Sequence, residues 1–126
     1  MPKPRVTFVD RPSPNFNDRK GQSISFLIIH YTAMDSAEAA IQRLCDPKTE
    51  VSSHYVVGKD GVIYRLVDEE KRAWHAGISF WDDHNDLNSS SIGIEIDNNG
   101  EEPFNKVQMD AVVALCRDII ARRKIR

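Results

Sequence analysis

The sequence is poor in cysteine and contains no long hydrophobic run. Its two cysteines, Cys45 and Cys116, each lie inside a helix-like segment, and neither belongs to a CxxC pair. Two partly buried thiols explain them better than a disulfide or a catalytic nucleophile does. No run approaches the ~18 consecutive apolar residues that a membrane span requires. We therefore expect no transmembrane segment.

A dominant charge of either sign is also missing. The chain carries 17 Lys and Arg against 19 Asp and Glu, which gives a formal net charge of −2. Such a balance produces no general field that would attract a nucleic acid or an anionic membrane, so we expect no nucleic-acid partner. The short basic ending RRKIR is explained by a solvated helix terminus.

The first 22 residues, MPKPRVTFVDRPSPNFNDRKGQ, contain four of the six prolines. Each proline fixes φ and removes a backbone donor, so we predict an extended, irregular lead-in over 1–22 and one domain over 23–126. No apolar signal-peptide core is visible in this stretch. The compartment is therefore left open: cytoplasmic, or periplasmic or secreted if a leader has been removed.

Hydrophobic periodicity predicts an α/β fold with strands at 25–31, 53–57, 62–67 and 91–97. The second and third of these strands form a hairpin around an Asp-Gly turn. Helices are predicted at 35–45 and 106–123. The stripe expected to pack on the sheet consists of Met109, Val112, Val113, Cys116, Ile119 and Ile120. The aperiodic stretch between the hairpin and the last strand predicts a long ordered loop, which is typical of functional segments.

Two polar side chains stand out on the predicted strands. His30 ends the apolar run SFLIIHYTA, and Glu95 alternates with three isoleucines in SIGIEID. Taken singly, the histidine is better explained as a hydrogen-bonded core residue, and the glutamate is equally well explained as a solvated residue of an edge strand. If both side chains share a face of the sheet, they offer an imidazole that binds zinc and a carboxylate that accepts a proton from water.

The other histidines give weaker signals. His75 lies in AWHAG, where it either packs on Trp74 or faces a ligand that Gly77 allows to come close. His54 is best explained as a core residue, and His84, which lies among acidic residues, as solvated. No HExxH or HxxxH pair occurs, so local spacing alone does not establish a metal site.

Together these segments resemble the zinc-dependent N-acetylmuramoyl-L-alanine amidases (amidase type 2), relatives of phage lysozyme-type amidases and peptidoglycan recognition proteins. The matching stretches, in order and at fitting intervals, are IIHYTA (28–33), VSSHYVVGKDGVIYRLV (51–67), AWHAGISFW (73–81) and LNSSSIGIEIDNNG (87–100). The resemblance implies a central mixed β-sheet flanked by helices. It also implies Zn²⁺ as cofactor and peptidoglycan or a muropeptide as substrate.

The resemblance further implies a role for five residues. His30 corresponds to a zinc ligand and Glu95 to the catalytic acid/base, while Trp74, His75 and Asn88 border the substrate groove. The implied reaction is hydrolysis of the amide bond between N-acetylmuramic acid and L-alanine by zinc-activated water. Polymeric cell wall and soluble anhydro-muropeptide both remain open as substrates.

One departure from the family pattern concerns the zinc ligands. Family members continue after the last helix into a segment with a second ligand histidine and a third ligand, aspartate or cysteine, whereas this sequence ends at Arg126. A catalytic zinc site needs three protein ligands. We therefore expect a domain without its C-terminal part, either a fragment or a truncated, inactive copy. A catalytically inactive peptidoglycan-binding module is the alternative function, and a ligand role for His54 or His75 is a less favoured alternative.

Overall fold

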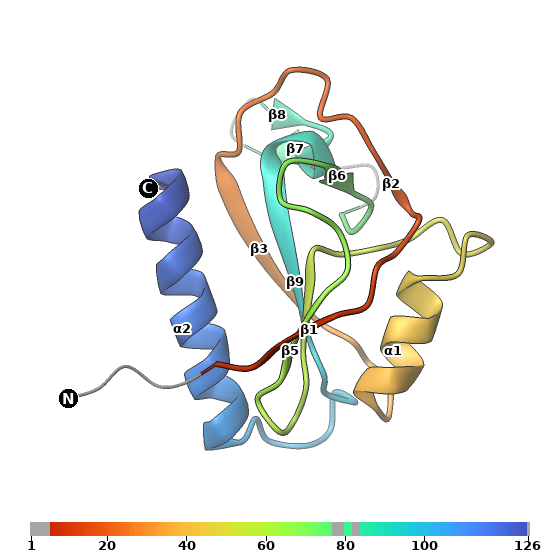
Figure 1. Cartoon of the computed structure of the whole chain (residues 1–126), viewed down its shortest axis with the longest axis vertical. Helices are drawn as coiled ribbons and strands as arrows, with labels where there is room; N and C mark the ends of the chain where they lie inside the picture. Colours follow the sequence, from red (N-terminus) through yellow and green to blue (C-terminus); the bar gives the residue numbers. More distant parts are fainter. Residues whose placement is uncertain (1–5, 77–79, 82–83, 126) are drawn as a thin grey trace.

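The structure is a computed structural model of the chain, and it describes residues 6–76, 80–81 and 84–125. One five-stranded sheet forms its centre, with the strand order β1-β5-β4-β9-β3. The strands are β1 (Phe8–Asp10), β3 (Phe26–Tyr31), β4 (Tyr55–Val57), β5 (Ile63–Arg65) and β9 (Ser91–Ile96). Helices α1 (Ala37–Leu44) and α2 (Lys106–Arg123) lie on opposite sides of this sheet (Figure 1).

Short elements occupy the end of the sheet at which β9 begins. They are the antiparallel pair β2 (Phe16–Asn17) and β6 (Arg72–Ala73), the antiparallel pair β7 (Phe80–Trp81) and β8 (His84–Asn85), and a 3₁₀ helix, η1 (Leu87–Ser90). The loop predicted between the hairpin and the last strand therefore contains short pieces of regular structure. Gly77 and the side chain of His84 lie outside the described part of the chain, so the expectations for them stay predictions.

The sheet is mixed, as predicted. The central strand β9 pairs in parallel with both β3 and β4, and β4 pairs antiparallel with β5 in the predicted hairpin. In β9, Ile92, Ile94 and Ile96 are buried on the α2 side, against Val112, Leu115 and other residues of that helix. Because side chains alternate along a strand, Gly93 and Glu95 face the α1 side.

The N-terminal segment is more regular than predicted. Residues 1–22 were expected to form an irregular lead-in, but β1 pairs in parallel with β5, and Phe8 lies opposite Ile63. β1 is the outermost strand on its side of the sheet, where a nearby proline removes no hydrogen bond that the ladder needs. The segment also buries Asn15 and Arg19, whose side chains donate to backbone carbonyls of the domain.

Both predicted helices are present, and each has a side-chain cap. Ser36 accepts a hydrogen bond from the N–H of Ala39 at the start of α1, and Asn105 accepts one from the N–H of Gln108 at the start of α2. These bonds satisfy backbone donors that a helix start leaves without partners. Cys45 and Cys116 are half-buried free thiols, as expected. Within the described residues, no helix combines the length and the apolar character needed to cross a membrane.

The buried side of α2 differs from the predicted stripe. Val112 and Ile119 are buried, but Val113 and Ile120 are 47% and 42% exposed. The buried face instead includes Ala111, Leu115 and Gln108. Gln108 is buried because its amide donates to the carbonyls of Val57 and Asp97 at the end of the sheet. The buried face of α2 is therefore displaced by about one residue from the predicted apolar stripe, and it includes this hydrogen-bonded amide.

Candidate active site

His30 and Glu95 stand side by side on neighbouring strands. In the parallel pairing of β3 with β9, His30 lies directly opposite Glu95. Adjacent strands are about 4.8 Å apart, and register partners point to the same face of a sheet. Both side chains therefore project toward α1, and both are partly buried. The structure brings together the imidazole and the carboxylate that the sequence singled out.

A cavity of about 880 Å³ opens on this face of the sheet, with walls formed by α1, the end of β3, β9 and residues of the 72–75 segment. Its lining includes four of the five predicted site residues: Trp74, His75, Asn88 and Glu95. His30 adjoins this lining through Glu95 and His75. A hollow of this size matches those that hold small ligands.

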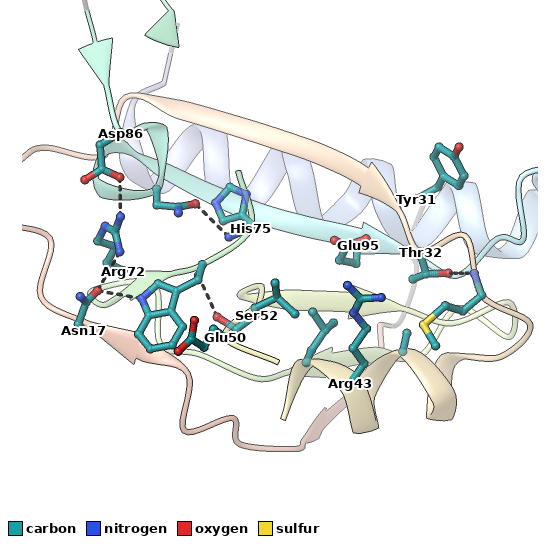
Figure 2. Close-up of a pocket in the computed structure, with 16 residues that line it drawn as sticks. Asn17, Tyr31, Thr32, Arg43, Glu50, Ser52, Arg72, His75, Asp86 and Glu95 are labelled. Carbon is teal, nitrogen blue, oxygen red and sulfur yellow. Dashed lines mark hydrogen bonds and ion pairs between the residues drawn. The ribbon is translucent and has the colours of Figure 1, made fainter. Parts of the chain in front are cut away.

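Glu95 is poised for proton transfer. Burial raises the pKa of its carboxyl to about 7, although the positive charge of Arg43 acts in the opposite direction. Figure 2 shows Arg43 rising from α1 toward the part of β9 from which Glu95 points into the cavity. A carboxyl group with a pKa near neutrality can both accept and return a proton, which is what a general acid/base requires.

His75 connects the loop before β7 with both strands of the site. Its Nδ1 lies 3.1 Å from Nε2 of His30, and its Nε2 lies 3.0 Å from the hydroxyl of Ser91. Asn88 accepts hydrogen bonds from the backbone N–H groups of His75 and Ala76 and so fixes this part of the loop. Burial is the main reason that the pKa of His75 falls to about 3, and burial also lowers the pKa of His30. Both rings are therefore neutral near pH 7.

Gly93 makes room for the ring of His75. A Cβ atom at Gly93 would lie 2.6 Å from Cγ of His75, well inside ordinary contact distance. On the other side, the N–H of Gly93 donates to Nδ1 of His54 over 3.0 Å, and Nε2 of His54 lies 2.9 Å from the carbonyl oxygen of Lys71. His54 is fully buried, which confirms its interpretation as a core histidine. Because both of its ring nitrogens are engaged, His54 is not available as a metal ligand.

Trp74 and Arg72 are held by polar contacts at one end of the cavity. The indole N–H of Trp74 donates to Asn17 over 3.0 Å, and Arg72 forms an ion pair with Asp86 (Figure 2). Arg43 differs, because among the described residues no hydrogen bond or ion pair engages its guanidinium. As far as the described residues show, the guanidinium of Arg43 is therefore available to an anionic ligand.

The described residues fit a zinc ion in part. His30 offers a neutral imidazole whose Nδ1 has no partner in the described part of the chain, and Glu95 stands beside it. Neutral imidazole nitrogen is a preferred zinc donor. However, no group of three histidine, cysteine or acidic side chains with metal-binding geometry occurs among the described residues. A complete three-ligand site would need donors that these residues do not provide.

Sequence reasoning missed Ser91, Arg43 and Arg19. Ser91 could have been found by extending the alternation of Gly93 and Glu95 by two residues along the strand. Arg43 follows from no local pattern, since only the packing of α1 brings it to the cavity. Arg19 is 5% exposed and donates to the carbonyls of Glu69 and Ser91. Through the carbonyl of Ser91, this buried arginine contacts the strand that carries Glu95.

Comparison with known proteins identifies relatives of this chain. Over 120 residues the chain is 42% identical to the N-acetylmuramoyl-L-alanine amidase AmiD of Escherichia coli, covering 82% of this chain and 42% of that protein. It is 30% identical to the 1,6-anhydro-N-acetylmuramyl-L-alanine amidase AmpD of Haemophilus influenzae, covering 90% of this chain and 81% of AmpD. The chain thus spans less than half the length of AmiD but most of AmpD.

A solved structure gives the same picture. The complex of Escherichia coli AmiD with the substrate anhydro-N-acetylmuramic acid-L-Ala-D-γ-Glu-L-Lys superposes with a TM-score of 0.76 at 39% identity, over 87% of this chain and 46% of AmiD. The sequence model of the amidase family matches residues 20–126, a range that includes all five of the predicted site residues. With His30 and Glu95 paired on one face of a matching sheet, this chain belongs to the N-acetylmuramoyl-L-alanine amidase family (Amidase_2).

Proposed function

We propose that the protein hydrolyses the amide bond between N-acetylmuramic acid and L-alanine in peptidoglycan or a muropeptide. One observation carries the proposal: His30 and Glu95 are register partners on β3 and β9, with side chains on the face that holds the cavity. The relatives AmiD and AmpD are both named as amidases of this kind, which supports the same reaction, and the AmiD complex contains an anhydro-muropeptide substrate.

In this proposal Glu95 moves the protons. With a pKa near 7, its carboxylate accepts a proton from the attacking water and returns it to the amine of L-alanine as that group departs. His30 would hold zinc through its imidazole, and the remaining ligands would have to come from outside the described residues. When bound, zinc supplies Lewis acidity that polarises the carbonyl and activates water. The half-buried position of both residues limits competing contacts with bulk water.

The remaining residues of the cavity bind the substrate. Trp74 offers an apolar face to a sugar ring or peptide, and Asn88 and His75 shape the adjacent wall. Arg43 adds a recognition element, because its guanidinium, which has no hydrogen-bond or ion-pair partner in the described part of the chain, suits a carboxylate of the stem peptide. Arg72 is less available, since Asp86 already neutralises it. We infer that Arg43 distinguishes stem peptides with a free carboxylate from amidated ones.

A Glu95→Gln variant tests the assignment of the acid/base. The amide keeps the shape of the side chain but cannot accept the proton, so the release of the stem peptide from an anhydro-muropeptide, followed by mass spectrometry, should fall at least ~100-fold. Glu101→Gln is the matched control, because Glu101 is exposed and lies outside the cavity. Full activity in the Glu95→Gln variant would remove Glu95 from the mechanism.

The second candidate function is a peptidoglycan-binding module without catalysis. It is favoured by one observation, that the described residues supply no three-ligand metal group. Zinc quantification after exhaustive dialysis, combined with muropeptide binding by calorimetry, separates the two functions. Stoichiometric zinc with turnover supports the amidase. Muropeptide binding with neither zinc nor turnover supports the binding module instead.

A further inference from the structure

We propose that His75 is a positioning residue for His30. In this arrangement Nδ1 of His75 accepts the hydrogen on Nε2 of His30, and His30 is held as the tautomer whose Nδ1 lone pair is available to a cation. The inference rests on the proposed function, in which His30 binds zinc, and it specifies the ring atom that does so.

The geometry of the two rings is that of a directional hydrogen bond. Nε2 of His30 and Nδ1 of His75 are 3.1 Å apart, although the residues are 45 positions apart in the sequence. The ring centroids are separated by 5.3 Å, and the ring planes meet at 68°. An edge-on contact of this kind aligns an N–H with a lone pair, whereas stacked rings would not.

The shared hydrogen can be arranged in two self-consistent ways. Either His30 donates from Nε2 and His75 passes its own Nε2–H to Ser91, or Ser91 donates to His75 and His75 donates from Nδ1 to His30. Only the first arrangement leaves Nδ1 of His30 with a lone pair. Metal-binding histidines generally donate their other ring N–H to a fixed partner, which sets both tautomer and ring orientation. The proposed function therefore selects the first arrangement.

His75 is suited to fix His30 because its own ring is confined. The hydroxyl that contacts Nε2 of His75 belongs to Ser91, which is fully buried in β9. Gly93 lies against the ring so closely that a single added carbon would overlap it. Asn88 holds the backbone of His75 through a 3.0 Å hydrogen bond. His30, by contrast, is half-buried and has only this one ring contact among the described hydrogen bonds. The confined ring therefore orients the freer one.

Long-range ¹H–¹⁵N NMR of the histidine rings in the metal-free protein tests the proposal directly. In the wild type, His30 should be predominantly the Nε2–H tautomer. A His75→Asn variant keeps a polar atom near the former Nδ1 and should retain this state. His75→Gln, which extends toward the former Nε2, should give a mixture of His30 tautomers. A wild-type His30 in the Nδ1–H form would overturn the proposal without any need for a variant.

Zinc affinity provides a second readout that a merely structural role would not move. Loss of an outer-shell partner typically weakens metal binding 10–100-fold, so His75→Gln should reduce zinc affinity in chelator competition, and His75→Asn should restore most of it. Equal zinc affinity in both variants, with matching amide spectra that exclude misfolding, would refute a positioning role.

Amidase turnover is measured separately from the His30 tautomer and from zinc affinity. An active enzyme with the wrong His30 tautomer refutes only this inference, whereas the expected tautomer without turnover refutes only the proposed function.

Discussion

Gly93 is the position at which a single methyl group should disturb the site most. A Gly93→Ala substitution places Cβ at 2.6 Å from Cγ of His75 and 2.7 Å from its Nδ1 and Cδ2, where ordinary contact begins near 3.4 Å. The backbone does not resist alanine, because Gly93 lies in β9 and its φ is not positive. The cost therefore arises from the ring of His75, which must move away from Gly93 and so disturb its 3.1 Å contact with His30.

Two contributions set the magnitude. Overpacking in a filled site typically costs about 1–3 kcal/mol, and a lost hydrogen bond between His30 and His75 about 0.5–1.5 kcal/mol. We expect Gly93→Ala to lower the free energy of unfolding by about 2–4 kcal/mol, since both effects follow from one displacement. Gly58→Ala should cost less, because a Cβ there meets mainly the movable carboxylate of exposed Asp60.

Urea unfolding followed by circular dichroism measures these differences, and a double-mutant cycle identifies their source. In a His75→Ala background the ring is absent, so Gly93→Ala should then be nearly neutral. The coupling energy between the two positions should therefore equal nearly the whole cost, about 2–4 kcal/mol, because the two residues are in direct contact. If Gly93→Ala costs the same with and without the ring, the clash argument is wrong. A cost no larger than that of Gly58→Ala would also contradict it.

Two further predictions concern charged residues. Burial alone would raise the pKa of Glu69, but hydrogen bonds from Arg122, Tyr55 and Arg123 lower it to about 2. The folded-state pKa of Glu69 therefore lies below the unfolded value of ~4.3. Its contribution to the free energy of unfolding is present above that pH and is lost as the pH falls toward 2. In urea unfolding, Glu69→Gln should lower the free energy of unfolding by about 2–3 kcal/mol at pH 7 and by little at pH 2. A loss that is equal at both pH values would contradict this reasoning. For Arg43→Ala, we expect KM for a muropeptide with a free D-glutamate carboxylate to rise about tenfold, because one charge-assisted hydrogen bond is lost. KM for the amidated analogue should stay nearly unchanged. An equal rise of KM for both substrates would argue against carboxylate recognition.

Local patterns in the sequence determined most of the secondary structure. Alternation placed Ile92, Ile94 and Ile96 on one face of β9, and the Asp-Gly turn specified the β4–β5 hairpin. The α2 stripe was less accurate, because apolar periodicity does not register a buried amide such as Gln108. The N-terminal strand β1 was missed, because its pairing with β5 depends on a partner more than fifty residues away.

The candidate site shows the same division. The sequence by itself identified His30 and Glu95 as unusual, since each interrupts an apolar strand pattern. It did not determine that they are neighbours, because alternation gives the face of each strand separately and not the register between strands. Only tertiary packing placed Arg43 on the cavity wall and brought His75 to the ring of His30. Contacts between residues so far apart in the chain depend on how the sheet, the helices and the loops assemble, which no local pattern encodes.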